Sequence, residues 1–476
     1  MKHQKKELFP KTPTGISGLD EITDGGFPKG RPVLLCGSAG CGKTLLATQF
    51  IVKGISDFNE PGVIMTFEES GKDLALNARS LGFDLDKLQE EKKLRIDHVK
   101  IERSEIEETG EYDLEALFIR LNYAIDSVGA KRVVLDTIES LFAGMNDLGL
   151  LRAEIRRLFQ WLKEKGVTTI ITAERGEGSL TRHGLEEYVS DCVILLDFRV
   201  IDQIATRRLR IVKYRGSNHG TNEYPFLIEN EGIFVIPVTS LKLEHQSSRE
   251  VVSTGLPELD EMFTKGGVFR GSSILVTGTA GTAKTILAAY FAYASCLRGE
   301  PVLYFSFEES PDQFIRNMSS VGLNLKQFVK SKLLYIYASR PSLQGLEMHL
   351  LTFHKLMETF NPKTVIIDPI SSLITVGSNS EVRAMLVRLM DTLKTKQISA
   401  MFTSLTHHQS SLYNDVTVDA VSSLSDTWIN VINDIRNNER TRNLLIVKSR
   451  GMGHQNDLQQ FTITSKGIKF QNTKQN

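Results

Sequence analysis

Short apolar runs alternate with longer amphipathic stretches along the whole chain. In the first half, the apolar runs predict strands at Val33–Cys36, Val63–Phe67, Leu94–Val99, Val133–Asp136, Thr168–Ala173 and Val193–Asp197. The intervening segments place Leu, Ala, Glu and Lys at helical spacing, for example in Asp113–Val128 and Leu150–Lys165. This alternation predicts an α/β fold, with a mostly parallel sheet flanked by helices on both faces.

The same pattern occurs twice. Thr14–Gly30 recurs as Thr254–Gly271, Val63–Ser70 as Leu303–Ser310, Val133–Leu141 as Val365–Leu373 and Ile211–His219 as Ile446–His454, all in the same order. A repeat this long indicates two copies of one domain rather than a solenoid. We therefore predict an N-terminal segment at 1–11, a first domain at 12–240, a polar linker at 241–252 and a second domain at 253–476.

A complete phosphate loop follows the first predicted strand. Its sequence has the form G-x-x-x-x-G-K-[ST] and leads into a helix-forming segment; its residues are Gly37, Ser38, Ala39, Gly40, Cys41, Gly42, Lys43 and Thr44. Small residues let the backbone N–H groups surround phosphate oxygens, and the helix N-terminus adds partial positive charge. Lys43 is expected to neutralise the β- and γ-phosphates, and Thr44 to ligate Mg²⁺. A ligand-free glycine-rich turn is the weaker interpretation.

The second copy departs from this motif at one position. Its loop is Gly278, Thr279, Ala280, Gly281, Thr282, Ala283, Lys284 and Thr285, with Ala283 where the motif has glycine. A methyl group there can crowd the phosphates or alter a backbone angle that glycine tolerates. Because Lys284 and Thr285 are intact, we expect nucleotide binding with altered affinity.

Carboxylates follow two further strands in each copy. Asp136 and Asp368 end apolar strands, the position of the carboxylate that assists Mg²⁺ beside a phosphate loop. Glu68-Glu69 and Glu308-Glu309 lie in two identical FEES segments, where a glutamate can accept a proton from water or a hydroxyl. A turn-capping aspartate and a solvated glutamate pair are the alternatives, and the duplication favours catalysis.

Basic residues end a late strand in each copy. Lys213 and Arg215 match Lys448 and Arg450 in two K-x-R-G segments. They lie far along the chain from their own phosphate loop, so we expect them to act as arginine-finger cations on a neighbouring subunit's phosphate. A solvated basic edge strand is the alternative.

Composition excludes several classes of function. The formal net charge is zero, so the chain lacks the basic field of a non-specific nucleic-acid binder. The four cysteines show no metal-ligand spacing and favour a reducing compartment. The N-terminus lacks a signal-peptide core, and no apolar run is long enough to span a bilayer. We expect a cytoplasmic protein with neither a membrane nor a nucleic-acid partner.

These motifs together resemble the KaiC family of circadian clock ATPases, over about Thr12 to Gly467. The resemblance implies two RecA-like P-loop domains in tandem and a homohexamer of two stacked rings, with ATP and Mg²⁺ at subunit interfaces. It further implies a slow ATPase in the first ring and a serine/threonine autokinase and autophosphatase in the second. It assigns nucleotide or catalytic roles to the loop, carboxylate and cation positions above, and places His219 and His454 near the nucleotide.

The resemblance also identifies phosphoacceptors. The family's acceptor pair corresponds to Ser422-Ser423, and Thr417 matches a further hydroxyl position. Ser423 replaces the threonine usual in the family, which a kinase should tolerate. The matching stretch of the first copy, Glu187–Asp191, has no acceptor pair, which supports kinase chemistry in the second ring only.

The chain ends nine residues after Gly467, before the tail to which KaiA docks in the family. We therefore expect no KaiA control and, in place of a daily oscillator, a signalling timer or a switch for energy or stress, with or without a KaiB-like partner. A RecA-like DNA-dependent motor is the main alternative, although neutral charge and missing stacking aromatics count against it. A nucleotide-binding scaffold without turnover is the third.

Overall fold

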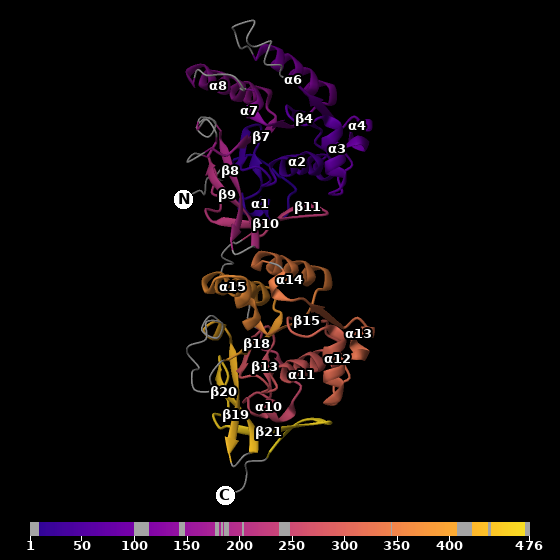
Figure 1. Cartoon of the computed structure of the whole chain (residues 1–476), viewed down its shortest axis with the longest axis vertical. Helices are drawn as coiled ribbons and strands as arrows, with labels where there is room; N and C mark the ends of the chain where they lie inside the picture. The colour runs from indigo at the N-terminus through magenta and orange to yellow at the C-terminus, as the bar shows by residue number, and fades with distance from the viewer. Residues whose placement is uncertain are drawn as a thin grey trace, which may run out of the picture. The chain divides into compact units, whose positions relative to one another are not determined.

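Each half of the chain forms its own sheet with flanking helices. The computed structural model (Figure 1) describes residues 9–99, 114–141, 148–176, 180–181, 184, 190–201, 204–237, 248–343, 345–406, 421–436 and 439–471. The chain divides into one unit at Met1–Thr239 and another at Ser240–Asn476. None of the described helices combines the length and apolarity that crossing a membrane requires.

The main sheet of the first unit has the strand order β11-β10-β9-β8-β3-β7-β6-β4-β5. Its strands are β3 (Pro32–Gly37), β4 (Gly62–Thr66), β5 (Leu94–His98), β6 (Arg132–Asp136), β7 (Thr168–Glu174), β8 (Cys192–Ile201), β9 (Ile204–Tyr214), β10 (Glu223–Glu229) and β11 (Gly232–Val235). The strands from β8 to β5 pair in parallel, and β9, β10 and β11 extend the sheet antiparallel. A small second sheet pairs β1 (Lys11–Thr12) with β2 (Phe27–Pro28).

Helices cover both faces of this sheet. They are α1 (Leu19–Ile22), α2 (Lys43–Phe58), α3 (Gly71–Arg79), α4 (Leu85–Glu90), α6 (Glu115–Val128), α7 (Ile138–Leu141) and α8 (Leu148–Lys165). One core joins α1–α4 to alternate strand residues such as Val33 and Leu35, and the other joins α6–α8 to the intervening residues Leu34 and Cys36. In Figure 1, α2, α3 and α4 form one group and α6, α7 and α8 another. Alternate strand residues thus supply two cores, as expected of a parallel sheet buried on both faces.

The second unit repeats this plan, with the strand order β16-β15-β17-β18-β14-β19-β20-β21-β22. Its strands are β12 (Val251–Val252), β13 (Val268–Phe269), β14 (Ser273–Gly278), β15 (Val302–Ser306), β16 (Leu334–Ala338), β17 (Thr364–Asp368), β18 (Ser399–Leu405), β19 (Thr427–Arg436), β20 (Glu439–Ser449), β21 (Gln459–Thr464) and β22 (Gly467–Phe470). Its helices are α10 (Pro257–Glu261), α11 (Lys284–Leu297), α12 (Pro311–Ser320), α13 (Lys326–Lys330), α14 (Leu346–Phe360) and α15 (Asn379–Thr395), with 3-10 turns at Pro341–Leu343 and Ile370–Val376.

The predicted fold class is confirmed, because both units contain a mostly parallel sheet between helices. All six strands predicted in the first half are present to within a few residues at their ends. Val251 and Val252, at the end of the predicted linker, form β12 and pair with β13. In both units the phosphate loop, the FEES segment and the strand-end aspartate follow adjacent or nearby parallel strands. They therefore meet at the carboxyl edge of the sheet, where α/β proteins bind nucleotides.

Candidate nucleotide sites

The first phosphate loop joins β3 to α2 and is closed by its own lysine. Gly42, immediately before the helix, has φ of 104°, in the left-handed region that glycine tolerates. The Lys43 Nζ donates to the carbonyl oxygens of Gly37 (2.9 Å) and Ser38 (3.0 Å). The ammonium is therefore held over the loop, beside the N-terminus of α2, where phosphate charge is best stabilised.

The second loop has the same form despite its alanine. Ala283 has φ of 82°, so it adopts the left-handed conformation at the position where the first loop has Gly42. The Lys284 Nζ donates to the carbonyl oxygens of Gly278 and Thr279, both at 2.9 Å. Burial lowers the pKa of this ammonium. The alanine preserves the loop and carries the backbone strain that glycine avoids.

Two arginines of β20 also contact the second loop. The Arg440 Nη2 donates to the carbonyl oxygens of Ala280 and Gly281 at 3.3 Å, and the Arg442 Nε donates to that of Gly281 at 3.2 Å. Sequence reasoning missed both residues. The sequence shows only that arginines alternate along the predicted strand. Their contact with the loop depends on how β20 folds back beside it, which the sequence does not reveal.

Asp136 meets the loop threonine of the first unit. Its Oδ2 accepts a hydrogen bond from the Thr44 hydroxyl at 2.8 Å, and its Oδ1 accepts one from Thr172. Burial raises the pKa of Asp136, a change that the two hydroxyls and Lys43 oppose. A hydroxyl and a carboxylate oxygen side by side suit Mg²⁺, which prefers hard oxygen ligands.

Asp368 has different neighbours in the second unit. Its Oδ2 accepts a hydrogen bond from the Tyr304 hydroxyl at 2.7 Å, and its Oδ1 accepts one from Thr403. Tyr304 is fully buried in β15, and burial together with Asp368 raises the pKa of its phenol. The matching residue of β4 is Ile64, which has no hydroxyl. No hydrogen bond joins Thr285 to Asp368 within the described part of the chain.

The first glutamate of each FEES segment lies beside the turn that follows the strand-end aspartate. In the first unit, Glu68 Oε1 accepts hydrogen bonds from Thr137 (3.0 Å) and Ser140 (2.6 Å). In the second unit, Ser372 donates to Glu308 Oε1 at 3.4 Å. Pro369 occupies the position of Thr137 and therefore offers no hydroxyl to the glutamate. The Glu308 carboxylate is therefore held less tightly by its own subunit.

The second glutamate of each segment is tied to the following helix. Asn77 donates to Glu69 Oε1, and Asn317 donates to Glu309 Oε1 at 2.9 Å. Burial raises the pKa of Glu69, with Asp136 and Asp73 adding to the effect and the Asn77 bond opposing it. The serine that ends each FEES segment caps the helix that follows. Each motif thus combines a structural role with a carboxylate near the loop.

The K-x-R-G cations lie at the opposite ends of the parallel strands from the phosphate loop. β9 runs antiparallel to β8, so its end at Tyr214 adjoins Cys192 and the start of β3, whereas the phosphate loop follows the end of β3. The same register places the end of β20 beside Thr427 and the start of β14. The structure therefore does not bring these cations to their own unit's loop.

The cations of the second unit contact the predicted acceptor segment. The Lys448 Nζ donates to the carbonyl oxygen of Ser422, and the Arg450 Nη2 donates to that of Ser423. Ser422 is half-buried at the end of a helical segment, and Ser423 is exposed in the turn that follows it, before β19. In the first unit, Arg215 instead lies 3.6 Å from the carboxylate of Asp191. Lys213 is the penultimate residue of β9, next to Tyr214 at the end of that strand.

The remaining predicted residues are less informative. His219 stacks on Tyr214 with ring centroids 6.2 Å apart, and His454 Nδ1 lies 3.0 Å from the carbonyl oxygen of Gln455. Thr417 lies outside the described residues. None of the four cysteines forms a disulfide, and no cluster of metal-binding side chains occurs in the described ranges; the cysteines are Cys36, Cys41, Cys192 and Cys296.

The repeated TG…LD segments are structural. Asp20 Oδ1 accepts hydrogen bonds from the backbone N–H (2.8 Å) and hydroxyl (2.7 Å) of Thr14. Asp260 Oδ1 receives the same two bonds from Thr254, also at 2.8 and 2.7 Å. These contacts fix the chain before each short helix and leave the carboxylates no role at the loop.

A family model described as the KaiC ATPase matches this chain twice, at residues 12–240 and 252–475. The circadian clock protein KaiC2 of Synechocystis sp. is 54% identical over 458 residues, which cover 96% of this chain and 81% of that protein. The circadian clock oscillator protein KaiC of Parathermosynechococcus lividus is 37% identical, with 98% and 86% covered. The protein of that name from Synechococcus elongatus is also 37% identical, with 98% and 90% covered.

Proposed function

The chain belongs to the KaiC ATPase family, and from this premise we propose that it is a hexameric ATPase whose second domain phosphorylates its own Ser422 and Ser423. The first domain hydrolyses ATP slowly, and the second also removes the phosphoryl groups. The phosphorylation state then serves as a signalling timer or a switch for energy or stress, with or without a KaiB-like partner.

One observation carries this proposal: Lys448 and Arg450 donate to the backbone of Ser422 and Ser423. The two cations therefore lie beside the backbone of both serines, at the ends of the strands opposite their own phosphate loop. An acceptor placed there is served by another subunit's ATP. Arranged head to tail, the subunits of a ring supply loop and acceptor alternately at every interface.

The transfer uses groups of both subunits. A serine Oγ attacks the γ-phosphorus, the bond to the β–γ bridging oxygen breaks, and ADP leaves with that oxygen. Glu308 accepts the serine proton, and Lys284 with the partner cations stabilises charge on the transferring group. Thr285 and Asp368 offer oxygen ligands suited to Mg²⁺, whose charge neutralises the phosphates when it is bound.

The different surroundings of the two glutamates support the division of labour. Glu68 already accepts two hydroxyl hydrogen bonds, whereas Glu308 accepts one long bond. A less encumbered carboxylate is the better acceptor for a proton from a serine. Thr44 and Asp136 offer the matching Mg²⁺ ligands in the first domain, where we propose that water is the nucleophile.

The test is phosphopeptide mapping after incubation with labelled ATP. We expect label on Ser422 or Ser423, none in Ser422→Ala/Ser423→Ala, and a rate lower by about 100-fold in Glu308→Gln. Glu68→Gln is the matched control and should lower ATP hydrolysis while labelling persists. Label that survives in the double alanine variant would move the acceptor elsewhere, with Thr417 next. An unlabelled wild type would reduce the protein to an ATPase.

A further inference from the structure

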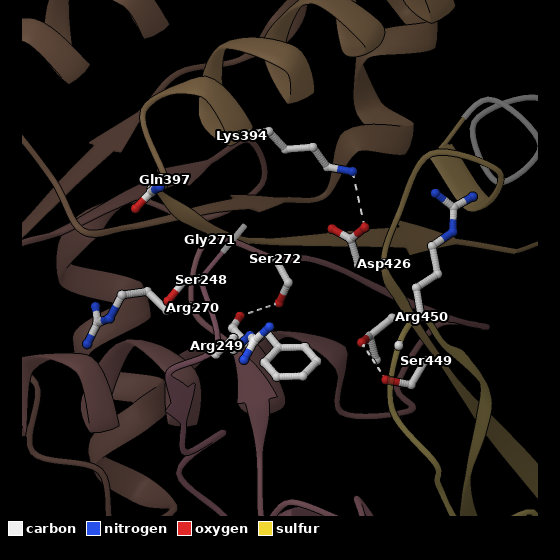
Figure 2. Close-up of a pocket in the computed structure, with 13 residues that line it drawn as sticks. Ser248, Arg249, Arg270, Gly271, Ser272, Lys394, Gln397, Asp426, Ser449 and Arg450 are labelled. Carbon is white, nitrogen blue, oxygen red and sulfur yellow. Dashed lines mark hydrogen bonds and ion pairs between the residues drawn. The ribbon is translucent and has the colours of Figure 1, made fainter. Parts of the chain in front are cut away.

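Lys394, near the end of α15, contacts the turn that carries the predicted acceptors. Its Nζ donates to the carbonyl oxygen of Leu424 at 3.1 Å and to Asp426 Oδ1 at 3.2 Å. Figure 2 shows this ammonium beside the Asp426 carboxylate. Only 19% of the Lys394 side chain and 24% of the Asp426 side chain are exposed. A lysine of a neighbouring helix therefore ties the acceptor turn to the aspartate that follows it.

Ser273, the first residue of β14, orients the carboxylate of Asp426. Its backbone N–H donates to Asp426 Oδ2 at 2.9 Å, and its hydroxyl donates to the same oxygen at 2.8 Å. The Asp426 N–H donates to the carbonyl oxygen of Ser273 at 2.9 Å. Because β14 lies between β18 and β19 in the sheet, these bonds anchor the carboxylate to a central strand. The anchored carboxylate in turn fixes the position of the Lys394 ammonium.

The first unit has the same lysine and aspartate but surrounds them differently. The sheet registers and equal spacing match three residues of the first unit to three of the second: Lys163 to Lys394, Pro32 to Ser273 and Asp191 to Asp426. Lys163 lies 2.7 Å from Asp191, and Arg31 and Arg215 each lie 3.6 Å from the same carboxylate. Pro32 has no backbone N–H to offer. Three cations thus neutralise one buried aspartate.

Two serines at the start of β14 change this arrangement in the second unit. Ser272 stands where the first unit has Arg31, and Ser273 supplies two uncharged donors to Asp426. Asp426 therefore depends less on neighbouring cations than Asp191 does. An ammonium has three N–H donors, so Lys394 can bond to the aspartate and still hold a backbone carbonyl.

Three consecutive carbonyl groups of the acceptor turn accept bonds from cations. The carbonyl oxygens of residues 422, 423 and 424 accept from Lys448, Arg450 and Lys394, in that order. The first two cations lie at the end of β20, whereas Lys394 belongs to α15. Charge-assisted hydrogen bonds are stronger than neutral ones. The turn is therefore held by two separate elements of the fold.

We propose that Lys394 is a positioning residue for autophosphorylation: oriented by Asp426, it fixes the backbone that carries Ser422 and Ser423 before phosphoryl transfer. The proposal rests on the autokinase function proposed above. An ordered acceptor reacts faster, because little of its freedom remains to be lost in the transition state.

Lys394→Met tests this role, because it keeps the length of the side chain and removes its charge. We expect the labelling rate of Ser422 and Ser423 at saturating ATP to fall about tenfold, while the ATP concentration for half-maximal rate stays the same. Lys394→Arg keeps the charge and should recover most of the rate. Lys396→Met, at an exposed position two residues later, is the matched control and should label like the wild type.

Hydrogen exchange of the backbone at residues 421–427 gives a readout that needs no phosphorylation. Exchange should be faster in Lys394→Met than in the wild type or in Lys396→Met, because the turn loses one of its anchors. Unchanged exchange would overturn the proposal. So would a wild-type labelling rate in Lys394→Met, or a matching loss of ATP affinity that reveals a general packing defect. A wild type that never labels would contradict the proposed kinase, whereas faster exchange in Lys394→Met would still show that Lys394 holds the turn.

Discussion

At the scale of single residues, two aspartates in equivalent positions have acquired different partners. Asp136 accepts a hydrogen bond from the loop threonine, whereas Asp368 accepts one from the buried phenol of Tyr304. The phenol satisfies an oxygen that would otherwise be available to Thr285. Tyr304 thus orients Asp368 from behind, without contact to the nucleotide loop in the described structure.

Tyr304→Phe should therefore change Mg²⁺ use in the second domain only. Losing a hydrogen bond to a buried carboxylate typically costs about 1.5–3 kcal/mol, so we expect half-maximal phosphorylation to need about tenfold more Mg²⁺. The measurement is the labelling rate against Mg²⁺ concentration, with first-domain ATPase, in which Ile64 stands at this position, as an internal control. An equal loss of rate at every Mg²⁺ concentration would indicate a packing defect instead.

Ala283→Gly should relieve backbone strain. Alanine in the left-handed region costs about 1–2 kcal/mol of stability. Glycine removes this cost, but its greater freedom in the unfolded chain offsets part of the gain. We expect thermal unfolding of the second domain to shift upward slightly and its phosphorylation kinetics to change, while first-domain ATPase stays largely the same. Gly42→Ala is the matched control and should destabilise, because its new Cβ would lie 3.2 Å from the Ile228 Cδ1.

At the scale of elements, the end of β20 brings two cations together. Burial, with a smaller contribution from Arg450, lowers the pKa of Lys448 below the ordinary lysine value of 10.5. A lysine with a lowered pKa is charged below that pKa and neutral above it. Any step that needs its ammonium is therefore lost as the pH rises through this lowered value.

Lys448→Arg tests this dependence, because arginine stays charged throughout the range. We expect second-domain phosphorylation in the wild type to fall on the alkaline side, and the fall to move to higher pH in the variant. Lys284 also has a lowered pKa but is present in both proteins, so its contribution cancels. Superimposable alkaline limbs would show that Lys448 is not the titrating group.

The sequence was a good guide to elements and a partial guide to contacts. Strand positions followed from apolar runs, because each strand is buried on both faces and must be apolar along its length. The loops and their lysines were recognisable since phosphate binding restricts neighbouring residues in one short segment. Tyr304, Arg440 and Arg442 were not predicted, because their contacts join strands far apart in sequence and depend on register and strand pairing.

At the scale of the whole molecule, loop and strand-end cations occupy opposite edges of each sheet. Subunits defective at opposite edges should therefore complement each other. Mixing Glu68→Gln/Glu69→Gln chains with Arg215→Ala chains should restore part of the first-domain ATPase. Some interfaces would then combine the intact glutamates of one chain with the intact arginine of the other. Each variant alone is the control, and mixed hexamers without activity would contradict a composite site.

This opposition of edges gives the assembly a direction. In the ring that we propose, every subunit lends its cations to one neighbour and receives cations from the other, so an open arc of subunits would have an incomplete site at one end. Closure of the ring completes that last site without any new kind of contact. Nucleotide bound at the final interface would thus stabilise the closed ring. The number of active sites per assembly would then distinguish a closed ring from an open one.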